Sequence, residues 1–399
     1  MRKITLLLFT VLSALIARAG FMSGAGDDDH PAQAPVVNLS FATEEFIYVP
    51  IYTTSMGFRM LSGAKASFSG TSTIKSPSVD IGSPTGVYVL RTYADGSVGL
   101  DTRTDSNGVY IASADGLTPT FQYNLPASQE SVNGYLAFHV NEAKVDDSTP
   151  RVKDPGSMAG FEVTVSRDLP NWLGKRVLLK VTAGFALNDI KSQVITDVPA
   201  TISRTTDLYS LNGSLPPGTG YSGSTSGSIT ITNPDGSTSY LATNSATLIS
   251  AQPNSRTTAD TISNTAVTNT YKVKGGYFTA RLGPTFVFPF SEKFRASLSL
   301  GFLALYSATK FDVDEEFRTD DQLPMTQSAS DVEKKVLPGY YVDANLEYWV
   351  TEKTGFYAGA AYQGGGTYTQ VISTEDIKYT TKIDLKSLSG VRAGMNIRF

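Results

Sequence analysis

The sequence offers few residues that could carry out acid–base or nucleophilic chemistry. Its 399 residues include no cysteine and two histidines, His30 and His139. Without cysteine there can be no disulfide, thiol nucleophile or thiolate metal site. His139 has no serine or carboxylate nearby in a catalytic pattern, and a lone base does not form a triad. We therefore expect no enzymatic activity and interpret His139 as an ordinary residue of a loop or short strand.

Two acidic stretches, at 27–30 and 312–321, are candidates for binding a divalent cation. Carboxylate oxygens suit Ca²⁺, but the second stretch lacks the glycine and spacing of an EF-hand. Short charge runs are usually solvated, and the sequence has no phosphate-binding glycine loop or dinucleotide fingerprint. We expect no metal and no cofactor. The 33 basic and 37 acidic residues give a net charge of −4, without the basic face that nucleic acid requires.

The N-terminus has the pattern of a secretory signal peptide. A positive start at 1–3 precedes a mainly apolar run at 4–16, and Ala17 and Ala19 provide a small-x-small cleavage site. The apolar run is too short for a permanent transmembrane helix. We predict a signal peptide over 1–19, a linker over 20–56, and export through the inner membrane.

The rest of the chain shows recurrent alternation of apolar and polar residues. Period-two alternation indicates extended strands with two different environments on their faces. These segments are long for sandwich strands and suit tilted membrane strands. They lie at 57–69, 159–169, 176–189, 271–288, 294–311, 338–350, 355–369 and 387–399.

The connections between these segments alternate strictly in length. Short connections at 170–175, 289–293 and 351–354 alternate with long ones at 70–158, 190–270, 312–337 and 370–386. A membrane barrel has tight periplasmic turns and long external loops, and backbone groups in lipid must all be paired, so the sheet must close. We predict an all-β, membrane-spanning, antiparallel up-and-down β-barrel over 57–399, with about eight strands and large external loops at 70–158 and 190–270. Ten strands remain an alternative if a hairpin at 109–111 and 135–138 enters the barrel.

Aromatic residues gather at the predicted membrane boundaries. Amphipathic rings at one level form an interfacial girdle. At the short-turn end the girdle comprises Trp172, Phe288, Tyr348, Trp349 and Phe356, and at the other end Tyr306, Tyr340 and Tyr368 are candidates.

The C-terminus carries a resemblance to a known class of protein. Its apolar positions are Val391, Ala393, Met395, Ile397 and Phe399. This ending looks like the signal that the barrel-assembly machinery of Gram-negative outer membranes recognises. Strand number and turn asymmetry resemble the small OmpA/OmpX/OmpW-like outer-membrane barrels, and the stretch at 207–218 resembles uncharacterised barrel proteins. The resemblance implies an outer-membrane location, with membrane lipid and the assembly machinery as partners. It implies no activity.

Charged residues on the polar faces are predicted to point into the barrel. They are Arg59, Lys65, Glu162, Lys180, Arg281, Arg295, Asp343, Glu347 and Arg392. Because an eight-stranded barrel has room only for side chains, ion pairs between adjacent strands would plug it. We expect a structural or surface-interaction scaffold that displays its loops to an unidentified ligand. A narrow anion or small-solute channel is the alternative, and a hydrolase dependent on His139 is disfavoured.

Overall fold

The structure is a computed structural model. It describes residues 51–76, 79–85, 89–101, 116–123, 129–131, 133–170, 177–216, 221–222, 228–232, 238–242, 247–319 and 322–399. The predicted signal peptide, the linker up to residue 50, the acidic run at 27–30, Trp172 and residues 320–321 lie outside this part. The chain divides into two units, 1–48 and 49–399, and all the described residues belong to the second. No helix in the described part is long and apolar enough to cross a membrane.

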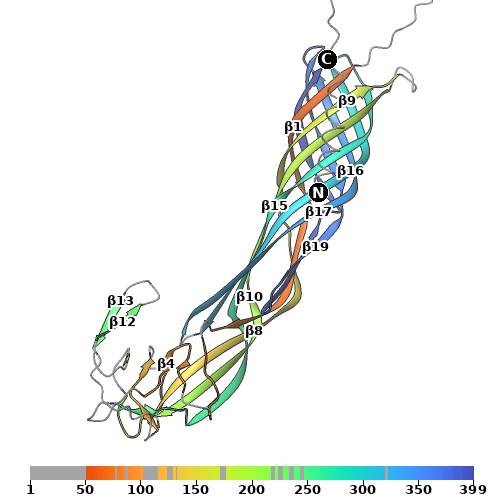
Figure 1. Ribbon diagram of the computed structural model, residues 1–399. Helices are drawn as coiled ribbons and strands as arrows, with labels where there is room; N and C mark the ends of the chain where they lie inside the picture. The colour runs from red at the N-terminus through yellow and green to blue at the C-terminus, as the bar shows by residue number, and fades with distance from the viewer. Residues whose placement is uncertain are drawn as a thin grey trace, which may run out of the picture. The chain divides into compact units, whose positions relative to one another are not determined.

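The described secondary structure consists of β-strands (Figure 1). The long strands are β1 (Tyr52–Ser62), β2 (Lys65–Lys75), β8 (Tyr135–Lys153), β9 (Met158–Asp168), β10 (Leu178–Ser210), β15 (Ser255–Pro289), β16 (Phe294–Thr319), β17 (Gln322–Trp349), β18 (Thr354–Gly364), β19 (Thr367–Ser373), β20 (Ile377–Asp384) and β21 (Leu388–Arg398). The short ones are β3 (Arg91–Thr92), β4 (Gly96–Val98), β5 (Leu117–Thr118), β6 (Phe121–Tyr123), β7 (Glu130–Ser131), β11 (Tyr221–Ser222), β12 (Ser228–Thr232), β13 (Thr238–Ala242) and β14 (Ile249–Ser250).

Part of the large sheet closes on itself. The pairing order β15-β16-β17-β18-β21-β1-β9-β10 is completed by a second pairing of β10 with β15. Every one of these pairings is antiparallel, and β1 illustrates the register: Phe58 lies opposite Ala393 on one side and Phe161 on the other. A closed ring leaves no strand edge unpaired. The prediction of an all-β antiparallel barrel is therefore confirmed.

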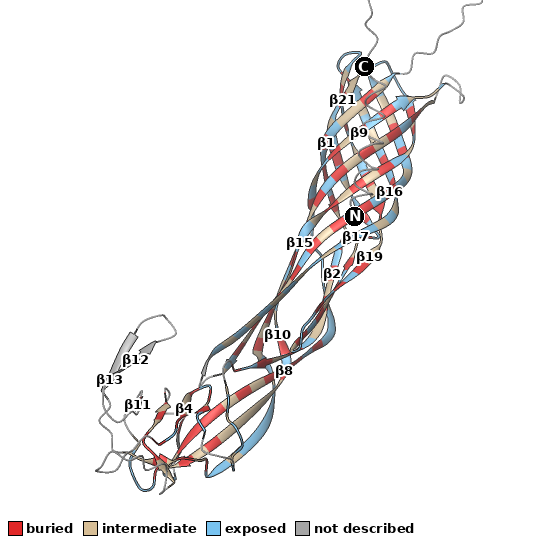
Figure 2. Cartoon of the chain, viewed as in Figure 1, coloured by how far each residue is buried: buried red, intermediate tan, exposed pale blue. Residues whose placement is uncertain are grey.

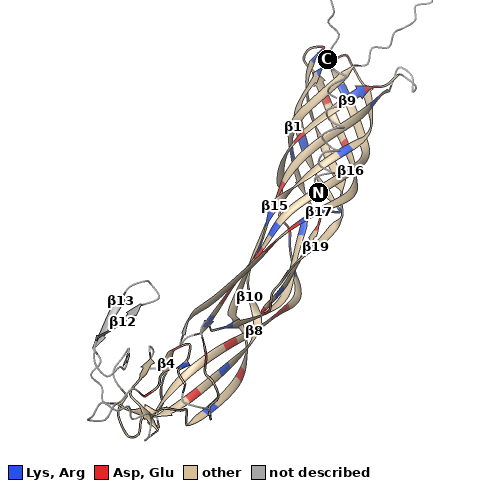
Figure 3. Cartoon of the chain, viewed as in Figure 1, with Lys and Arg blue, Asp and Glu red and all other residues tan. Residues whose placement is uncertain are grey.

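The ring is apolar outside and polar inside. Buried and exposed residues alternate along its strands (Figure 2). Phe302 on β16 is 83% exposed, and many outward neighbours such as Phe58 and Leu346 are also large apolar residues. Charged residues lie on the strands of the ring as well as farther along the sheet (Figure 3). A water-soluble barrel would place these residue types the other way round, so the ring is suited to a lipid environment.

The strands continue past the ring into a distal sheet. Strands β10, β15, β16 and β17 extend from the ring into the distal sheet without a break. The other four strands of the ring are separated from their distal continuations by short breaks: β1 from β2 at 63–64, β9 from β8 at 154–157, β18 from β19 at 365–366, and β21 from β20 at 385–387. The order here is β17-β16-β15-β10-β8-β2-β20-β19. The distal interior contains an apolar core that includes Phe68, Tyr271, Phe311 and Ile383. Its outward face is largely polar.

This distal sheet corrects the predicted loops. Residues 190–210 and 255–270, expected within an external loop, belong to β10 and β15, which have 33 and 35 residues. Much of 70–158 and 312–337 also forms strands, including β8 and the distal parts of β16 and β17. The outward face of the distal sheet is largely polar, so the alternation of apolar and polar residues weakens there. Tyr135–Phe138 begins β8, and 109–111 lies outside the described residues.

Short strands cover the distal end. β3, β4, β6 and β11 form a small sheet, and β14 pairs with β5. Tyr93, Phe121 and Tyr123 pack there against Phe138 of β8 and Tyr209 of β10. β12 and β13 pair antiparallel as a separate small hairpin.

Candidate functional site in the barrel interior

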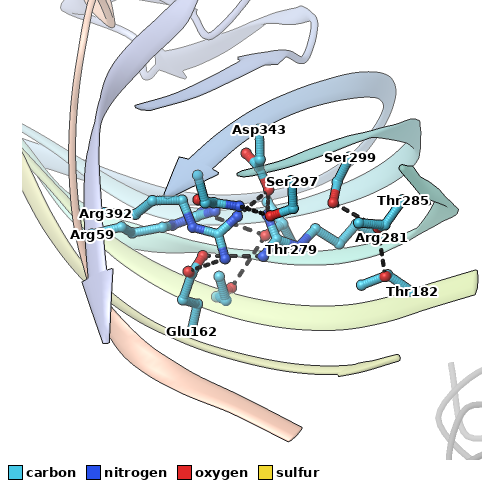
Figure 4. A network of polar contacts seen from close by, with 12 residues as sticks. Arg59, Glu162, Thr182, Thr279, Arg281, Thr285, Ser297, Ser299, Asp343 and Arg392 are labelled. Carbon is cyan, nitrogen blue, oxygen red and sulfur yellow. Dashed lines mark hydrogen bonds and ion pairs between the residues drawn. The ribbon is translucent and has the colours of Figure 1, made fainter. Parts of the chain in front are cut away.

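Five charged side chains meet inside the ring. Arg59, Glu162, Arg281, Asp343 and Arg392 are all buried and come from β1, β9, β15, β17 and β21 (Figure 4). Strict alternation directs each of them inward, because the residues on either side in the strand face outward. An unpaired charge in such a place is costly, so the positions of their partners decide what the interior can do.

Two arginines and two carboxylates form a closed ring of ion pairs. Arg281 Nη1 lies 2.6 Å from Asp343 Oδ2, and its Nη2 lies 3.1 Å from Glu162 Oε2. Arg392 pairs with the same two carboxylates. The Tyr357 hydroxyl donates to Glu162 Oε1 at 2.9 Å. Each carboxylate therefore joins both guanidinium groups, which ties β9, β15, β17 and β21 together across the interior.

Aromatic rings and a third arginine surround these ion pairs. Arg281 lies 5.3 Å from the ring centre of Tyr341, and Arg392 lies 5.1 Å from that of Tyr357, both within cation–π range. Arg59 donates instead to neutral acceptors, Asn188 Oδ1 at 2.7 Å and Thr279 Oγ1 at 3.4 Å. Three guanidinium groups thus face two carboxylates, an excess of positive charge in this cluster.

Hydroxyl groups fill the interior between this cluster and the short-turn end. Thr285 is hydrogen-bonded to Thr182 and to Ser299, each at 2.6 Å. Lys180 pairs with Asp168 at 3.1 Å. The cavity left among these side chains has a volume of about 50 Å³, which is room for a few water molecules. Around the ion pairs the interior is therefore filled by side chains.

The predicted interior residues near the short-turn end are less buried than the five charged residues of the central cluster. Arg295 and Glu347 are half-buried beside Trp349, whose Nε1 donates to Glu347 Oε2 at 3.3 Å. Arg295 and Arg398 lie 5.3 and 4.3 Å from the centre of the Trp349 rings. Trp349 is buried, so its expected place in the outward girdle is corrected: it alternates with Tyr348 and Val350 and therefore points inward.

Lys65 also differs from its expected place. It is exposed, while Ala64 and Ala66 are buried. The chain reverses its facing at Gly63, which has a positive φ of 98°. Because Lys65 follows this break, it lies on the outside of the distal sheet, and its neighbours Ala64 and Ala66 point into the core.

The remaining predicted residues lie mainly on the outer face. Phe288, Tyr348 and Phe356 are exposed near the short turns, and Tyr306 and Tyr340 are exposed farther along the strands. Tyr368 is instead inside the distal sheet, hydrogen-bonded to Ser307 and Thr309. Of the proposed assembly-signal residues, Val391, Ala393, Met395 and Phe399 are exposed and Ile397 is half-buried.

A histidine–carboxylate pair lies near the distal end, and the sequence did not predict it. His139 lies in β8 and is buried, with Nδ1 2.7 Å from Asp95 Oδ2, and its backbone N–H donates to Asp95 Oδ1 at 2.9 Å. The two residues are 44 positions apart, so no local spacing revealed the pair. No hydroxyl group of the described residues hydrogen-bonds to this histidine, and a base with an orienting acid still lacks a nucleophile.

The described residues contain no group of three or more histidine, aspartate or glutamate side chains that could hold a metal ion.

At the distal end, Asp207 accepts two hydrogen bonds from Arg256, each at 2.6 Å, and one from Tyr93 at 2.5 Å. Arg256 also donates to the backbone carbonyl groups of Ile81 and Gly82, so Tyr93, Ile81 and Gly82 are attached to β10 and β15. The distal end is therefore held by buried polar contacts as well as by aromatic packing.

Comparisons with known proteins give limited similarity. No family model and no curated protein matches the chain. Among solved structures, outer membrane protease OmpT from Escherichia coli covers 91% of this chain and 99% of its own, at 11% identity and a TM-score of 0.28. Ail of Yersinia pestis, titled an attachment invasion locus protein, covers 67% and 94% at 13% identity and a TM-score of 0.18. A FadL homologue of Pseudomonas aeruginosa covers 88% and 90% at 7% identity and a TM-score of 0.18. TM-scores this low do not establish a common fold, so function has to be argued from this chain's own residues.

Proposed function

We propose that this chain is an outer-membrane β-barrel protein of a Gram-negative-type bacterium, a structural or surface-interaction scaffold without catalytic activity. Its eight-stranded ring would span the membrane, and its distal sheet would lie outside the cell. The observation that carries the proposal is the ring itself, which is apolar on its outer face and crossed inside by the ion pairs of Arg281 and Arg392 with Glu162 and Asp343.

The outer face of the ring has the height that a bilayer requires. On β16 the outward residues are Phe294, Ala296, Leu298, Leu300, Phe302, Ala304 and Tyr306. From Phe294 to Tyr306 the strand covers about 40 Å at about 3.3 Å per residue, or about 30 Å along the barrel axis at a tilt of about 40°. Transmembrane barrels present an apolar band of about 25 Å with aromatic residues at its borders. The terminal positions, Phe294 and Tyr306, are both aromatic.

The filled interior favours a scaffold over a channel. The cavity beside the ion pairs, of about 50 Å³, holds only a few water molecules. The excess of arginine over carboxylate groups would attract anions. However, an anion could pass only if Arg281 or Arg392 left both carboxylates, which would expose unpaired buried charge.

The distal sheet gives the scaffold a surface on which recognition can take place. Long extracellular segments on a rigid barrel commonly carry binding residues, and the distal end is ordered by the Asp207–Arg256 contacts. A surface ligand, membrane lipid and the barrel-assembly machinery are the partners that this proposal requires. No step of the proposal uses His139.

Cysteine labelling in intact cells tests the proposed topology, because the native sequence contains no cysteine. Thr257 of β15 and Thr351 between β17 and β18 are both exposed, at opposite ends of the strands. A membrane-impermeant maleimide should label Thr257→Cys in intact cells and should label Thr351→Cys only after permeabilisation. Both variants should react equally in detergent. Labelling of Thr351→Cys in intact cells, or protection of Thr257→Cys, would overturn the proposal.

A further inference from the structure

Three lysines lie side by side on the outer face of the sheet, just past the ring. Lys191 of β10 is directly opposite Lys274 of β15, and Lys274 is directly opposite Lys310 of β16. All three are exposed, with 75% of the Lys191 side chain and 51% of the Lys310 side chain accessible. We refer to these three residues as the lysine row. Lys334 of β17, opposite Ala308, is a diagonal neighbour of Lys310.

Like charges directly opposite each other on paired strands are unfavourable, and the local carboxylates offset only part of this charge. Lys191 lies 3.4 Å from Asp189, and Lys310 lies 2.5 Å from Asp312. Lys274, in the centre of the row, has no ion-pair partner among the described residues. Together with Lys334, the patch carries four ammonium groups and two carboxylates. An external anion would relieve the repulsion at its centre.

The position of the row indicates which anion it meets. Four residues closer to the short turns, the same strands present Leu187, Phe278, Tyr306 and Val336, which pair across the sheet in that order. Past these residues the outer faces of the four strands become largely polar, with Ile195 of β10 and Val332 of β17 among the exposed apolar exceptions. Lys310 follows Tyr306 by four residues on β16, which is about 10 Å along the barrel axis at the rise and tilt used above. That distance places the ammonium groups at the level of lipid headgroups.

We propose that Lys191, Lys274 and Lys310 form a docking site for the phosphate groups of an anionic lipid in the leaflet that surrounds the distal end of the ring. Ammonium groups bind phosphate as point charges, and basic residues at a membrane surface gain affinity from anionic headgroups. The apolar residues Leu187, Phe278 and Tyr306 would contact the acyl chains of the same lipid. This inference rests on the proposed membrane-spanning function.

Lipid binding by charge-matched variants tests the site. The purified, refolded full-length protein is titrated with bisphosphorylated lipid A in mixed micelles. The test variant is Lys191→Gln, Lys274→Gln and Lys310→Gln. The control variant is Lys144→Gln, Lys378→Gln and Lys382→Gln, which removes three exposed lysines from β8 and β20. We expect the test variant to bind at least tenfold more weakly than the wild type, and the control to stay within twofold. A test variant within twofold of the wild type would overturn the inference.

Two further arms identify the source of the phosphate and separate this inference from the proposed function. Lipid A without phosphates should bind weakly and equally to the wild type and the test variant. Displacement of bound lipid A by 10 mM inorganic phosphate would show a site for free anions and overturn the assignment to a lipid. Insertion into phosphatidylcholine vesicles is measured for each variant. Failure of the wild type to insert contradicts the proposed function, whereas insertion with binding independent of the lysine row contradicts only this inference.

Discussion

Neutralising one carboxylate inside the ring should strongly destabilise the barrel. Glu162 is fully buried and accepts hydrogen bonds from Arg281 at 3.1 Å and from Tyr357 at 2.9 Å, in addition to its pair with Arg392. Glu162→Gln keeps the shape and one acceptor oxygen but removes the charge. Three arginines would then face Asp343 alone.

The expected magnitude follows from the burial of these charges. Removing one partner of a buried ion pair costs about 3–5 kcal/mol, because the other charge remains buried and uncompensated. The glutamine carbonyl still accepts a hydrogen bond, so we expect a loss near the lower bound, about 3 kcal/mol. Because both arginines retain Asp343, the barrel should still fold.

Urea unfolding of the refolded protein in phosphatidylcholine vesicles, followed by tryptophan fluorescence, measures this loss. The control is Glu347→Gln, which removes a half-buried carboxylate near the short turns and should cost less than about 1 kcal/mol. In a double-mutant cycle, Arg281→Met should cost less in the Glu162→Gln background than in the wild type, because the two residues share one network. A free energy of unfolding for Glu162→Gln within about 0.5 kcal/mol of the wild type would refute the role assigned to the ion pairs.

Three further predictions concern the rest of the molecule. Gly63→Ala should cost about 2–3 kcal/mol, because Gly63 has φ of 98° and a new Cβ would meet the Ser387 carbonyl; Gly156→Ala, at φ of 79° with open space around it, should cost about 1 kcal/mol by the same assay. Burial raises the pKa of Tyr209 to about 12, above the value of about 10 for an unfolded chain, so its contribution to stability is present below pH 10 and lost as the pH rises toward 12. Circular dichroism between pH 9 and pH 12 should show a smaller loss for Tyr209→Phe than for the wild type. Asp95→Ala leaves the His139 ring and backbone N–H without their acceptor, at a cost of about 1–3 kcal/mol; limited proteolysis should then cut within 79–99 faster while the barrel stays intact, and unchanged cleavage there would contradict the assigned contact.

The strands of the ring could be predicted from the sequence because their outward positions repeat apolar residues with a period of two. The alternation from Phe294 to Phe302 and from Val391 to Phe399 places the apolar residues outside, as the structure does. Trp349 was misassigned although its alternation with Tyr348 indicated an inward position. Its residue type and level in the membrane suggested a girdle, whereas the parity of the strand determines which face a side chain occupies.

Past the ring the outward positions are largely polar, and the period-two signal of the sequence weakens. In β15 the inward residues Asn269, Tyr271 and Val273 mix polar and apolar types, so the pattern resembles a loop. The reversal at Gly63 could not be predicted either, because glycine adopts positive and negative φ with similar ease, and the sequence does not show which one occurs. The pair of His139 with Asp95 depends on how a distant segment folds back onto β8, which local spacing does not encode.

The ionic current through the refolded full-length protein in a planar bilayer, measured after its insertion has been verified in vesicles, tests most directly whether the barrel interior is closed. A barrel filled around Arg281, Arg392, Glu162 and Asp343 should give no steady conductance above that of the lipid. The Glu162→Gln variant, if it shows brief openings, should pass anions in preference to cations, because it adds to the positive excess. A stable, ion-selective current through the wild-type protein would contradict the account.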